Sequence, residues 1–550
     1  MSEKEASVRR VGCPSCGGQL RYDIQTRKLL CTQCGSAHPM PEPQSANGPE
    51  ETVEVSAFRC PQCGAEIVSG STEATSFCSY CGSDVVLQQR LTRMQRPSGI
   101  VPFKVTREQC EEIYRKHLKG HFMAPGELRR QNVIDHFRPV YVPFWSYHVH
   151  AEGPFEVSGT SVENRSTETV YTKMKMQVDM RMDLREVLYD ASRAFEDETA
   201  ARLEHRMDGV VPFQPEYLSG LYAQIPDADP QIYRGEAAAN AYQHVIQELL
   251  EINRLSSVEM AETEEKARLP GEKIEQELVL MPVWLLAHRQ GDQVLYVAVN
   301  GANGKIVCDI PVSGVRVAAT TAATAAVIFA ILWVLPVMRP DWLMIPCTAI
   351  ALLTQYWICA VMRRLIFRQL RENEPNFADP SGFRGPLQRK LQLDRIRMEN
   401  KDKKDSAVRT TMSVLSALFR IFWKLILYGA IWLIGALAES LSGGTESGRL
   451  IAAAALIAGT FATHWRCFRL INDMPQHPIK AFAFWQNTLM LGANVAAILL
   501  LLFNLAEDWI YYLCSMMLMG LTIGAMAFLW GQHNRFATRP VPFFEEEEAQ

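Results

Sequence analysis

Eight of the fourteen cysteines lie in four Cys-x-x-Cys pairs near the beginning of the chain. The pairs form two sets with identical spacing, in which fourteen residues separate the second cysteine from the third. The sets are Cys13, Cys16, Cys31 and Cys34, followed by Cys60, Cys63, Cys78 and Cys81. Four thiolates satisfy tetrahedral Zn²⁺ and leave no open position, which is typical of a structural site and not of a catalytic one. The sequence therefore predicts two structural Zn²⁺ ions, each held by a zinc ribbon.

The local sequences around the cysteines also match, CPSCGG with CPQCGA and CTQCGS with CSYCGS, which indicates an internal duplication. A glycine follows the second cysteine of every pair, where we expect a tight turn around the metal: Gly17, Gly35, Gly64 and Gly82. Disulfides, redox thiols or an iron centre are the alternatives. The polar start MSEKEASVRR has no signal-peptide pattern, so a reducing cytosol is expected and metal is favoured over disulfides.

The charge of the ribbon region argues against nucleic acid as its partner. Residues 1–97 carry ten basic and ten acidic side chains. Binding to a phosphate backbone needs a positive surplus, and each tetrathiolate site adds about two negative charges. We expect the ribbons to contact a protein, with nucleic-acid binding or a purely structural cap as the alternatives. Residues 38–57, rich in Pro and Glu, predict a flexible linker between the two ribbons.

Residues 98–314 predict a cytosolic α+β domain, with 23 basic and 33 acidic residues and hence a net charge of −10. Helical patterns cover residues 107–118 and 236–255, and a strand with a methionine at most alternate positions covers 171–183. The methionine stripe favours a core face over a soft-metal site. A VPF element, a helix and a Pro-x-Trp segment occur twice, which indicates a second internal duplication with Trp145 and Trp284 as core anchors.

Two further features of this domain have simple interpretations. The segment NGANGK at residues 300–305 predicts a hairpin turn. His148 and His150 alternate on a predicted strand and could form a metal pair. They lack a third ligand nearby in the sequence, so ordinary surface histidines are favoured.

Several stretches together resemble a family of bacterial membrane proteins that carry TFIIB-type zinc ribbons. They are the paired ribbons, VPFKVTREQ, VYVPFW, VPFQPEYLSG, LMPVWLL and LYVAVNGANGKIVCDIPVSG, within about residues 58–365. This family is often labelled a primosomal or replication-restart helicase. A P-loop needs GxxxxGK[ST], whereas Gly304-Lys305 is followed by Ile306 and no helicase engine is predicted. The resemblance implies a role in envelope-stress assemblies, in which such proteins tether cytosolic scaffolds to the membrane. The chain departs from the family by its long C-terminal extension with extra membrane segments.

The second half of the chain predicts an all-α membrane domain. A bilayer-spanning helix needs about 20 apolar residues, and six runs qualify: 317–338, 342–362, 415–438, 449–465, 482–505 and 509–531. Residues 363–411 carry 13 basic and 7 acidic side chains, so the positive-inside rule places both termini in the cytosol and pairs the helices as three hairpins. Lys424 can snorkel to the interface, and Asn487 and Asn494 share a face that favours helix packing over a transport pathway.

The predicted protein is multidomain, with tandem small-β zinc ribbons, an α+β domain and about six membrane helices. The predicted divisions are ribbon 1 (1–37), a linker (38–57), ribbon 2 (58–97), the α+β domain (98–314), a transmembrane hairpin (315–365), a basic cytosolic linker (366–412), four further helices (413–535) and an acidic cytosolic tail (536–550).

No catalytic motif is found among HExxH, GxSxG, Walker and GxGxxG patterns, so a non-enzyme is expected. The favoured function is a multi-pass protein of the cytoplasmic membrane that anchors or docks a cytosolic protein, with the lipid bilayer as its second partner. One alternative is a transporter or channel regulated by the zinc ribbons. The other is a membrane-tethered nucleic-acid-binding protein.

Overall fold

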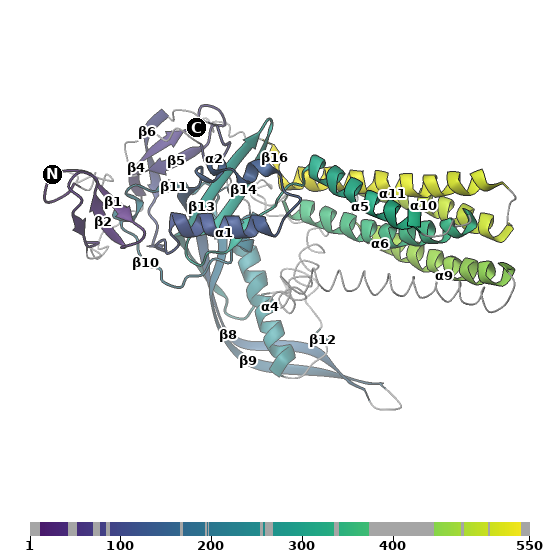
Figure 1. Ribbon diagram of the computed structural model, residues 1–550. Helices are drawn as coiled ribbons and strands as arrows, with labels where there is room; N and C mark the ends of the chain where they lie inside the picture. Colours follow the sequence, from purple (N-terminus) through teal and green to yellow (C-terminus); the bar gives the residue numbers. More distant parts are fainter. Residues whose placement is uncertain are drawn as a thin grey trace. The chain divides into compact units, whose positions relative to one another are not determined.

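The computed structural model describes residues 12–41, 52–69, 78–83, 88–164, 169–192, 195, 197–252, 257–258, 268–334, 340–372, 445–474, 478–503 and 507–540 (Figure 1). These residues divide into two compact units. The first unit contains the chain up to Ser313 and again from Ala537 onward, and the second contains the intervening helices from Gly314 to Phe536.

Long antiparallel strands organise the first unit. β8 (Arg138–Asn164) and β9 (Thr169–Asp190) form an extended hairpin, and β13 (Lys273–Gln290) pairs with the other edge of β8. β14 (Gln293–Asn300) and β15 (Ile306–Cys308) continue the sheet beyond β13. Every residue of β13 from 278 to 287 is buried, because both faces of the sheet are covered at that place.

Two helices cover this sheet at different places. α1 (Arg107–Lys119) is capped by Thr106, whose side-chain hydroxyl accepts a hydrogen bond from the backbone N–H of Gln109. The Gln109 side-chain oxygen accepts from the backbone N–H of Thr106 in turn. This capping box fixes the start of the predicted helix. α4 (Arg234–Ile252) packs along the β8–β9 hairpin (Figure 1). Its predicted last residues, 253–255, lie outside the described part of the chain.

Both tryptophans predicted as core anchors are buried, in two separate apolar clusters. The Trp145 indole donates to the Ala228 carbonyl at 2.9 Å, and the Trp284 indole donates to the Val105 carbonyl at the same distance. Each indole N–H thus has a partner inside the core, which removes the cost of burying it. Their strands, β8 and β13, are neighbours in the sheet.

The methionine stripe of β9 is a core face only at its inner end. Met182 is buried in the cluster beneath α4, and Met180 packs against that cluster. Met174, nearer the tip of the hairpin, is 36% exposed. The predicted turn at residues 300–305 is confirmed, since β14 ends at Asn300, β15 begins at Ile306, and Gly304 takes a φ of 75°.

The predicted boundaries of the ribbons need correction. Ribbon 1 contains β1 (Leu20–Asp23), β2 (Lys28–Cys31) and β3 (Ala37–His38), so it extends beyond residue 37. β4 (Thr52–Arg59) begins within the predicted linker and pairs with β5 (Glu66–Ser69) and β6 (Gln88–Gln95). The last six residues of the predicted linker are therefore strand, because their backbone groups pair with β6.

Short strands connect this part of the sheet to the long ones. β11 (Tyr222–Gln224) lies between β5 and β8, antiparallel to the first and parallel to the second. β7 (Gly99–Ile100) pairs with β13 and with β10 (Val211–Pro212), while β12 (Ser257–Val258) pairs with β8. Ribbon 2 is consequently built into the main sheet.

The second unit is helical. Its described helices are α5 (Gly314–Val334), α6 (Pro340–Glu372), α9 (Thr445–Asn472), α10 (Pro478–Phe503) and α11 (Asp508–Ala537). Among the described residues, three segments are long and apolar enough to span a membrane: Met344–Ile366, Ile479–Phe503 and Asp508–Ala537. The predicted span 449–465 lies within α9, and residues 317–334 of the predicted span 317–338 lie within α5, but neither is among these three segments. Residues 335–338, the predicted span 415–438 and Lys424 lie outside the described residues. α6 continues to Glu372 and so includes the start of the predicted basic linker.

Candidate metal centres

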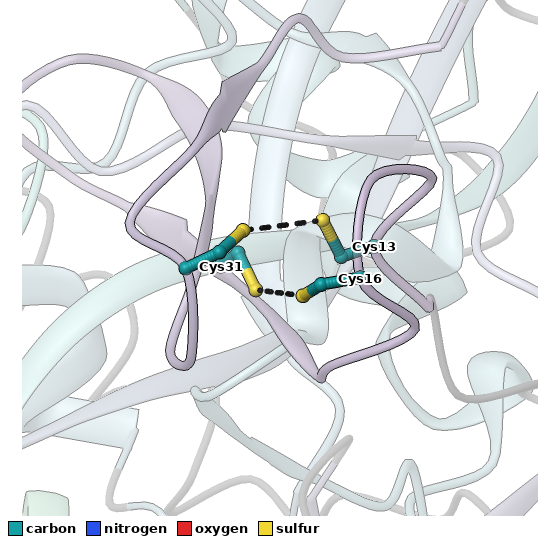
Figure 2. Close-up of side chains that lie close together, drawn as sticks. Cys13, Cys16 and Cys31 are labelled. Atoms are coloured by element: carbon teal, nitrogen blue, oxygen red, sulfur yellow. Dashed lines mark hydrogen bonds between the residues drawn. The ribbon is translucent and has the colours of Figure 1, made fainter.

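The four cysteines of each predicted set meet at one point in the structure. Each set offers four sulfur atoms that all lie within 4.8 Å of one another. In ribbon 1 the Sγ atoms of Cys13 and Cys34 are 3.7 Å apart, and those of Cys16 and Cys31 are 3.5 Å apart. Figure 2 shows the sulfurs of Cys13, Cys16 and Cys31 turned toward one another. A second set has the same arrangement in ribbon 2, where Cys60–Cys81 and Cys63–Cys78 are both 3.8 Å apart.

These separations fit tetrahedral zinc. A Zn–S bond of about 2.3 Å gives an edge of about 3.8 Å between sulfurs of a regular tetrahedron. The observed distances of 3.5–3.8 Å match that edge and are far longer than a disulfide bond of about 2.0 Å. None of the eight cysteines forms a disulfide. The residues present therefore fit two metal ions in all-sulfur sites.

Each pair of ligands is held by the turn that its glycine permits. Gly17, Gly35, Gly64 and Gly82 have φ between 67° and 79°, a region that residues with a Cβ rarely adopt. The N–H of each glycine donates to the carbonyl of the first cysteine of its pair, for example Gly17 to Cys13 at 2.8 Å and Gly64 to Cys60 at 2.8 Å. The predicted turns are confirmed, and the N–H directed at a sulfur comes from the next residue, Gly18, at 3.4 Å from Cys16.

Ribbon 1 contains polar neighbours that the spacing of its cysteines did not indicate. The Ser36 hydroxyl lies 3.3 Å from Cys13 Sγ and 3.0 Å from Cys34 Sγ, and His38 Nε2 lies 3.4 Å from Cys13 Sγ. The hydrogen bond with Ser36 lowers the pKa of the Cys13 thiol to about 5, and it also lowers the pKa of Cys34. The Gly18 N–H acts to lower the pKa of Cys16, but the neighbouring thiols of Cys34 and Cys31 outweigh it and raise that pKa to about 12. The lowered pKa values of Cys13 and Cys34 favour the thiolates that a metal requires.

Ribbon 1 is attached to the rest of its unit through residues 214–221. The Tyr22 N–H donates to the Ser219 carbonyl at 2.8 Å, and the Ser219 hydroxyl donates to the Leu20 carbonyl at 2.6 Å. The rings of Tyr22 and Tyr217 lie 5.3 Å apart. Gly220 has a φ of 81° and allows the Arg21 stem to approach this turn closely. The VPFQPEYLSG segment thus forms the surface against which the first ribbon packs.

Ribbon 2 contacts the strands of the β13–β14 hairpin. The Tyr296 hydroxyl donates to the Tyr80 carbonyl, and the Arg289 guanidinium donates to the Ser83 hydroxyl at 2.9 Å. A Cβ added at Gly82 would lie 3.0 Å from the Ala287 carbonyl oxygen. The second metal site therefore packs directly against the sheet.

The same edge of the sheet also holds the end of the described chain. β16 (Arg539–Pro540) pairs with β14, and the Arg539 guanidinium lies 5.4 Å from the centre of the Tyr296 ring. Tyr296 thereby joins ribbon 2 on one side to β16 on the other. Long-range pairing of this kind leaves no periodic pattern in the sequence.

His148 and His150 lie on a strand, β8, as predicted. Each lies near a carboxylate, and neither belongs to a group of three close metal ligands among the described residues. His148 pairs with Asp183 across the β8–β9 hairpin, and His150 lies 3.7 Å from Glu152. Within the described residues, the two cysteine sets are the groups of three or more close ligands. The interpretation as surface histidines is supported by their side-chain exposures of 34% and 35%.

The helical unit contains a buried polar cluster larger than the predicted asparagine pair. Gln355 on α6 donates to Asn487 Oδ1 on α10 at 2.9 Å, and His464 Nδ1 on α9 lies 2.9 Å from the same oxygen. Asn494 Nδ2 lies 3.2 Å from His464 Nε2, and Gln486 exchanges two bonds with Gln355. Gln355 and His464 were not predicted, although each is a single polar residue within an apolar run and could have been recognised on that basis. The cluster joins three helices, as expected for interhelical hydrogen bonds in lipid.

Comparison with known proteins gives one distant similarity. The chain is 25% identical over 323 residues to the uncharacterized protein YdjG of Bacillus subtilis (strain 168), covering 56% of this chain and 91% of YdjG. No family model matches the chain, and no solved structure matches it. The resemblance to membrane proteins with TFIIB-type ribbons accordingly stays a prediction from the motifs.

Proposed function

We propose that this chain is a non-enzymatic, zinc-dependent docking scaffold of the cytoplasmic membrane. Its helices anchor it in the bilayer as a multi-pass protein, and its ribbons face the cytosol with both termini. The observation that carries the proposal is the combination of two closed four-cysteine sites with three apolar helices in one chain. A closed site has no free coordination position for a substrate, so its metal shapes a surface and performs no chemistry.

The contacts of the ribbons refine the docking surface. The sequence predicted two ribbons joined by a flexible linker, and modules joined in that way can bind a shared or polymeric partner bivalently. Ribbon 1 is seated on residues 214–221, and ribbon 2 shares the main sheet. We therefore infer that a cytosolic protein partner docks on one composite surface that includes the first ribbon. An envelope-stress scaffold is the kind of partner that the motif resemblance favours.

The test removes ribbon 1 and leaves the sheet intact. Deleting residues 1–97 would also remove β4, β5 and β6, so the deletion should cover residues 2–41 only. Tagged full-length chain, the 2–41 deletion and a Cys13→Ser/Cys16→Ser variant are extracted in mild detergent, and bound proteins are quantified by mass spectrometry. We expect both altered chains to stay in the membrane and lose the partner at least tenfold. Deletion of residues 541–550 is the matched control.

Retention of every partner by the 2–41 deletion would contradict the docking role of ribbon 1. It would leave that ribbon as a structural cap.

A transporter or channel is the second candidate, because the Gln355–His464–Asn487 cluster is buried among helices. Among the described atoms, Asn487 Nδ2 and Asn494 Oδ1 have no hydrogen-bond partner. Purified chain in liposomes distinguishes the two candidates by ion and proton flux. If the chain is a scaffold, the flux should equal that of empty liposomes. A flux above that background that is abolished by Asn487→Leu would favour transport.

Membrane-tethered nucleic-acid binding is the third candidate. The first 314 residues carry a net charge of −10 before the zinc sites are counted. We expect no DNA or RNA binding by the purified chain near physiological ionic strength. Micromolar binding that weakens steeply with added salt would favour this candidate.

A further inference from the structure

The two metal centres differ in how far solvent reaches their sulfurs. In ribbon 1, Cys13 and Cys31 are buried, whereas Cys16 and Cys34 are exposed. In ribbon 2, Cys60 is 1% exposed and the other three ligands are fully buried. A dissolved oxidant can therefore reach two ligands of the first site and none of the second.

The material around the sulfurs differs in the same direction. Ribbon 2 encloses its cysteines with Phe58, Ile67 and Tyr80, and Tyr222 of β11 packs against this cluster. Each site has a serine hydroxyl beside its last cysteine, Ser36 at 3.0 Å from Cys34 and Ser83 at 3.3 Å from Cys81, and ribbon 1 adds His38 Nε2 at 3.4 Å from Cys13. Apolar packing excludes water and small polar reagents from the second site, while the exposed Cys16 and Cys34 leave the first accessible.

The two ribbons also differ in what depends on their folding. β5 of ribbon 2 pairs with β11, which pairs with β8, so the second ribbon is continuous with the main sheet. The three strands of ribbon 1 form a separate small sheet. Loss of metal from the first site would disturb one small sheet, whereas loss from the second would disturb the main one.

We propose that the first site is a reversible oxidation switch and that the second is a permanent structural site. A peroxide attacks the exposed thiolate of Cys16 or Cys34, and the first ribbon then releases its zinc while the second ribbon keeps its own. The inference requires metal binding by these cysteines. It is independent of which partner the scaffold binds.

The chemistry balances with hydrogen peroxide as the oxidant. The exposed thiolate attacks one peroxide oxygen, forming a sulfenic acid and releasing hydroxide. The neighbouring thiolate, Cys31 for Cys16 or Cys13 for Cys34, then attacks that sulfur, forms the disulfide and expels a second hydroxide. These neighbours lie 3.5 and 3.7 Å away and must close to about 2.0 Å. The site has then lost two of its four ligands, so zinc leaves.

Release of the metal removes the support for the first ribbon. Small ribbons draw much of their folding free energy from zinc. Without it the contacts of Tyr22 with Ser219 and Tyr217 are lost, and residues 214–221 become uncovered. The switch would thus change one defined part of the cytosolic surface and leave the sheet in place.

The test uses purified full-length chain in detergent, loaded with zinc and counted before treatment. Hydrogen peroxide is added in the presence of a chromogenic zinc chelator, and release is followed over time. We expect one equivalent to leave at least tenfold faster than the other, and reductant with added zinc to restore it. In a variant with Cys13, Cys16, Cys31 and Cys34 all changed to serine, the fast phase should vanish while the slow phase stays.

Peptide mapping of the unaltered chain keeps the test independent of how that variant folds. Samples taken during the fast phase are alkylated and digested, and disulfides are located by mass spectrometry. The proposal expects disulfides within residues 13–34 and free thiols within 60–81. Release of both equivalents at one rate, or a first disulfide among Cys60, Cys63, Cys78 and Cys81, would overturn it. Protein that holds no zinc before treatment would overturn the metal assignment itself.

Discussion

The four glycines beside the ligand cysteines share one backbone conformation but have different surroundings. Gly35 has a φ of 68° and open space where a Cβ would be. Gly82 has a φ of 67°, and a Cβ there would lie 3.0 Å from the Ala287 carbonyl oxygen and 3.1 Å from the Arg289 nitrogen. The same substitution at the two positions therefore separates backbone strain from steric conflict with the sheet.

We predict that Gly82→Ala releases the second zinc and that Gly35→Ala keeps the first. Left-handed backbone costs about 1–2 kcal/mol for a residue with a Cβ, and both variants bear this cost. Only Gly82→Ala also pushes ribbon 2 away from β13. Zinc content after dialysis against a weak chelator measures the difference. Equal zinc loss in both variants would mean that the contact with Ala287 is unimportant.

His205 makes the first unit sensitive to acid. Burial lowers the pKa of this imidazole to about 3, and its Nδ1 lies 3.2 Å from the Asn300 amide nitrogen. The unfolded chain, with a histidine pKa of about 6.5, binds the extra proton first as the pH falls. The contribution of neutral His205 is therefore complete above about pH 6.5 and declines as the pH falls toward 3.

We predict that lowering the pH from 7 to 5 reduces the stability of this unit by about 2 kcal/mol through His205. In His205→Asn, which retains a polar group near Asn300, that portion of the pH dependence should disappear. Amide hydrogen exchange of β14, compared between the two chains at each pH, measures it. Identical pH dependence in the two chains would show that His205 does not carry the effect.

At the scale of elements, the hydrogen bond of Tyr296 connects ribbon 2 to β14. The Tyr296 hydroxyl donates to Tyr80, while the face of its ring receives Arg539 of β16. Replacing this tyrosine with phenylalanine removes the first interaction and keeps the second. The substitution therefore tests the hydrogen bond between β14 and the second ribbon separately from the contact with β16.

Tyr296→Phe should lower the free energy needed to separate ribbon 2 from β14 by about 1 kcal/mol, the typical net value of one hydrogen bond. We expect amide exchange in residues 78–83 to become about fivefold faster, with β16 little changed. Tyr242→Phe, in the separate core beneath α4, is the matched control and should leave residues 78–83 unaffected. If amide exchange in residues 78–83 is unchanged in Tyr296→Phe, the hydrogen bond from Tyr296 to Tyr80 does not stabilise the second ribbon.

Local patterns in the sequence were sufficient for some elements and not for others. Cysteine spacing alone predicted both ligand sets, and the capping residues around Thr106 accompany a helix whose periodicity was visible. The pairing of Ile67 with Gln224, which joins ribbon 2 to the sheet, links residues far apart in the chain. Such register depends on tertiary packing, so the sequence predicted a linker where β4 begins and did not predict β16. The polar cluster of α6, α9 and α10 was foreseen only at Asn487 and Asn494.

For the whole molecule, the charges of the connecting segments predict the membrane topology. Apolar helices are described at Met344–Ile366, Ile479–Phe503 and Asp508–Ala537. The proposed arrangement has six spans and cytosolic termini, by the positive-inside rule. Reporter fusions after residues 50, 385 and 545 should report cytosol, and a fusion after residue 443 should report the outside. An outside result at residue 385 would contradict the three-hairpin scheme.

The central claim is that two four-sulfur sites hold zinc within one membrane-anchored chain, and metal content tests it most directly. Elemental analysis of the purified full-length protein, prepared without added metal, should give two zinc ions per chain. It should give one zinc ion when Cys13, Cys16, Cys31 and Cys34 are all replaced by serine. Protein that contains no zinc, or a variant that still holds two ions, would contradict the account.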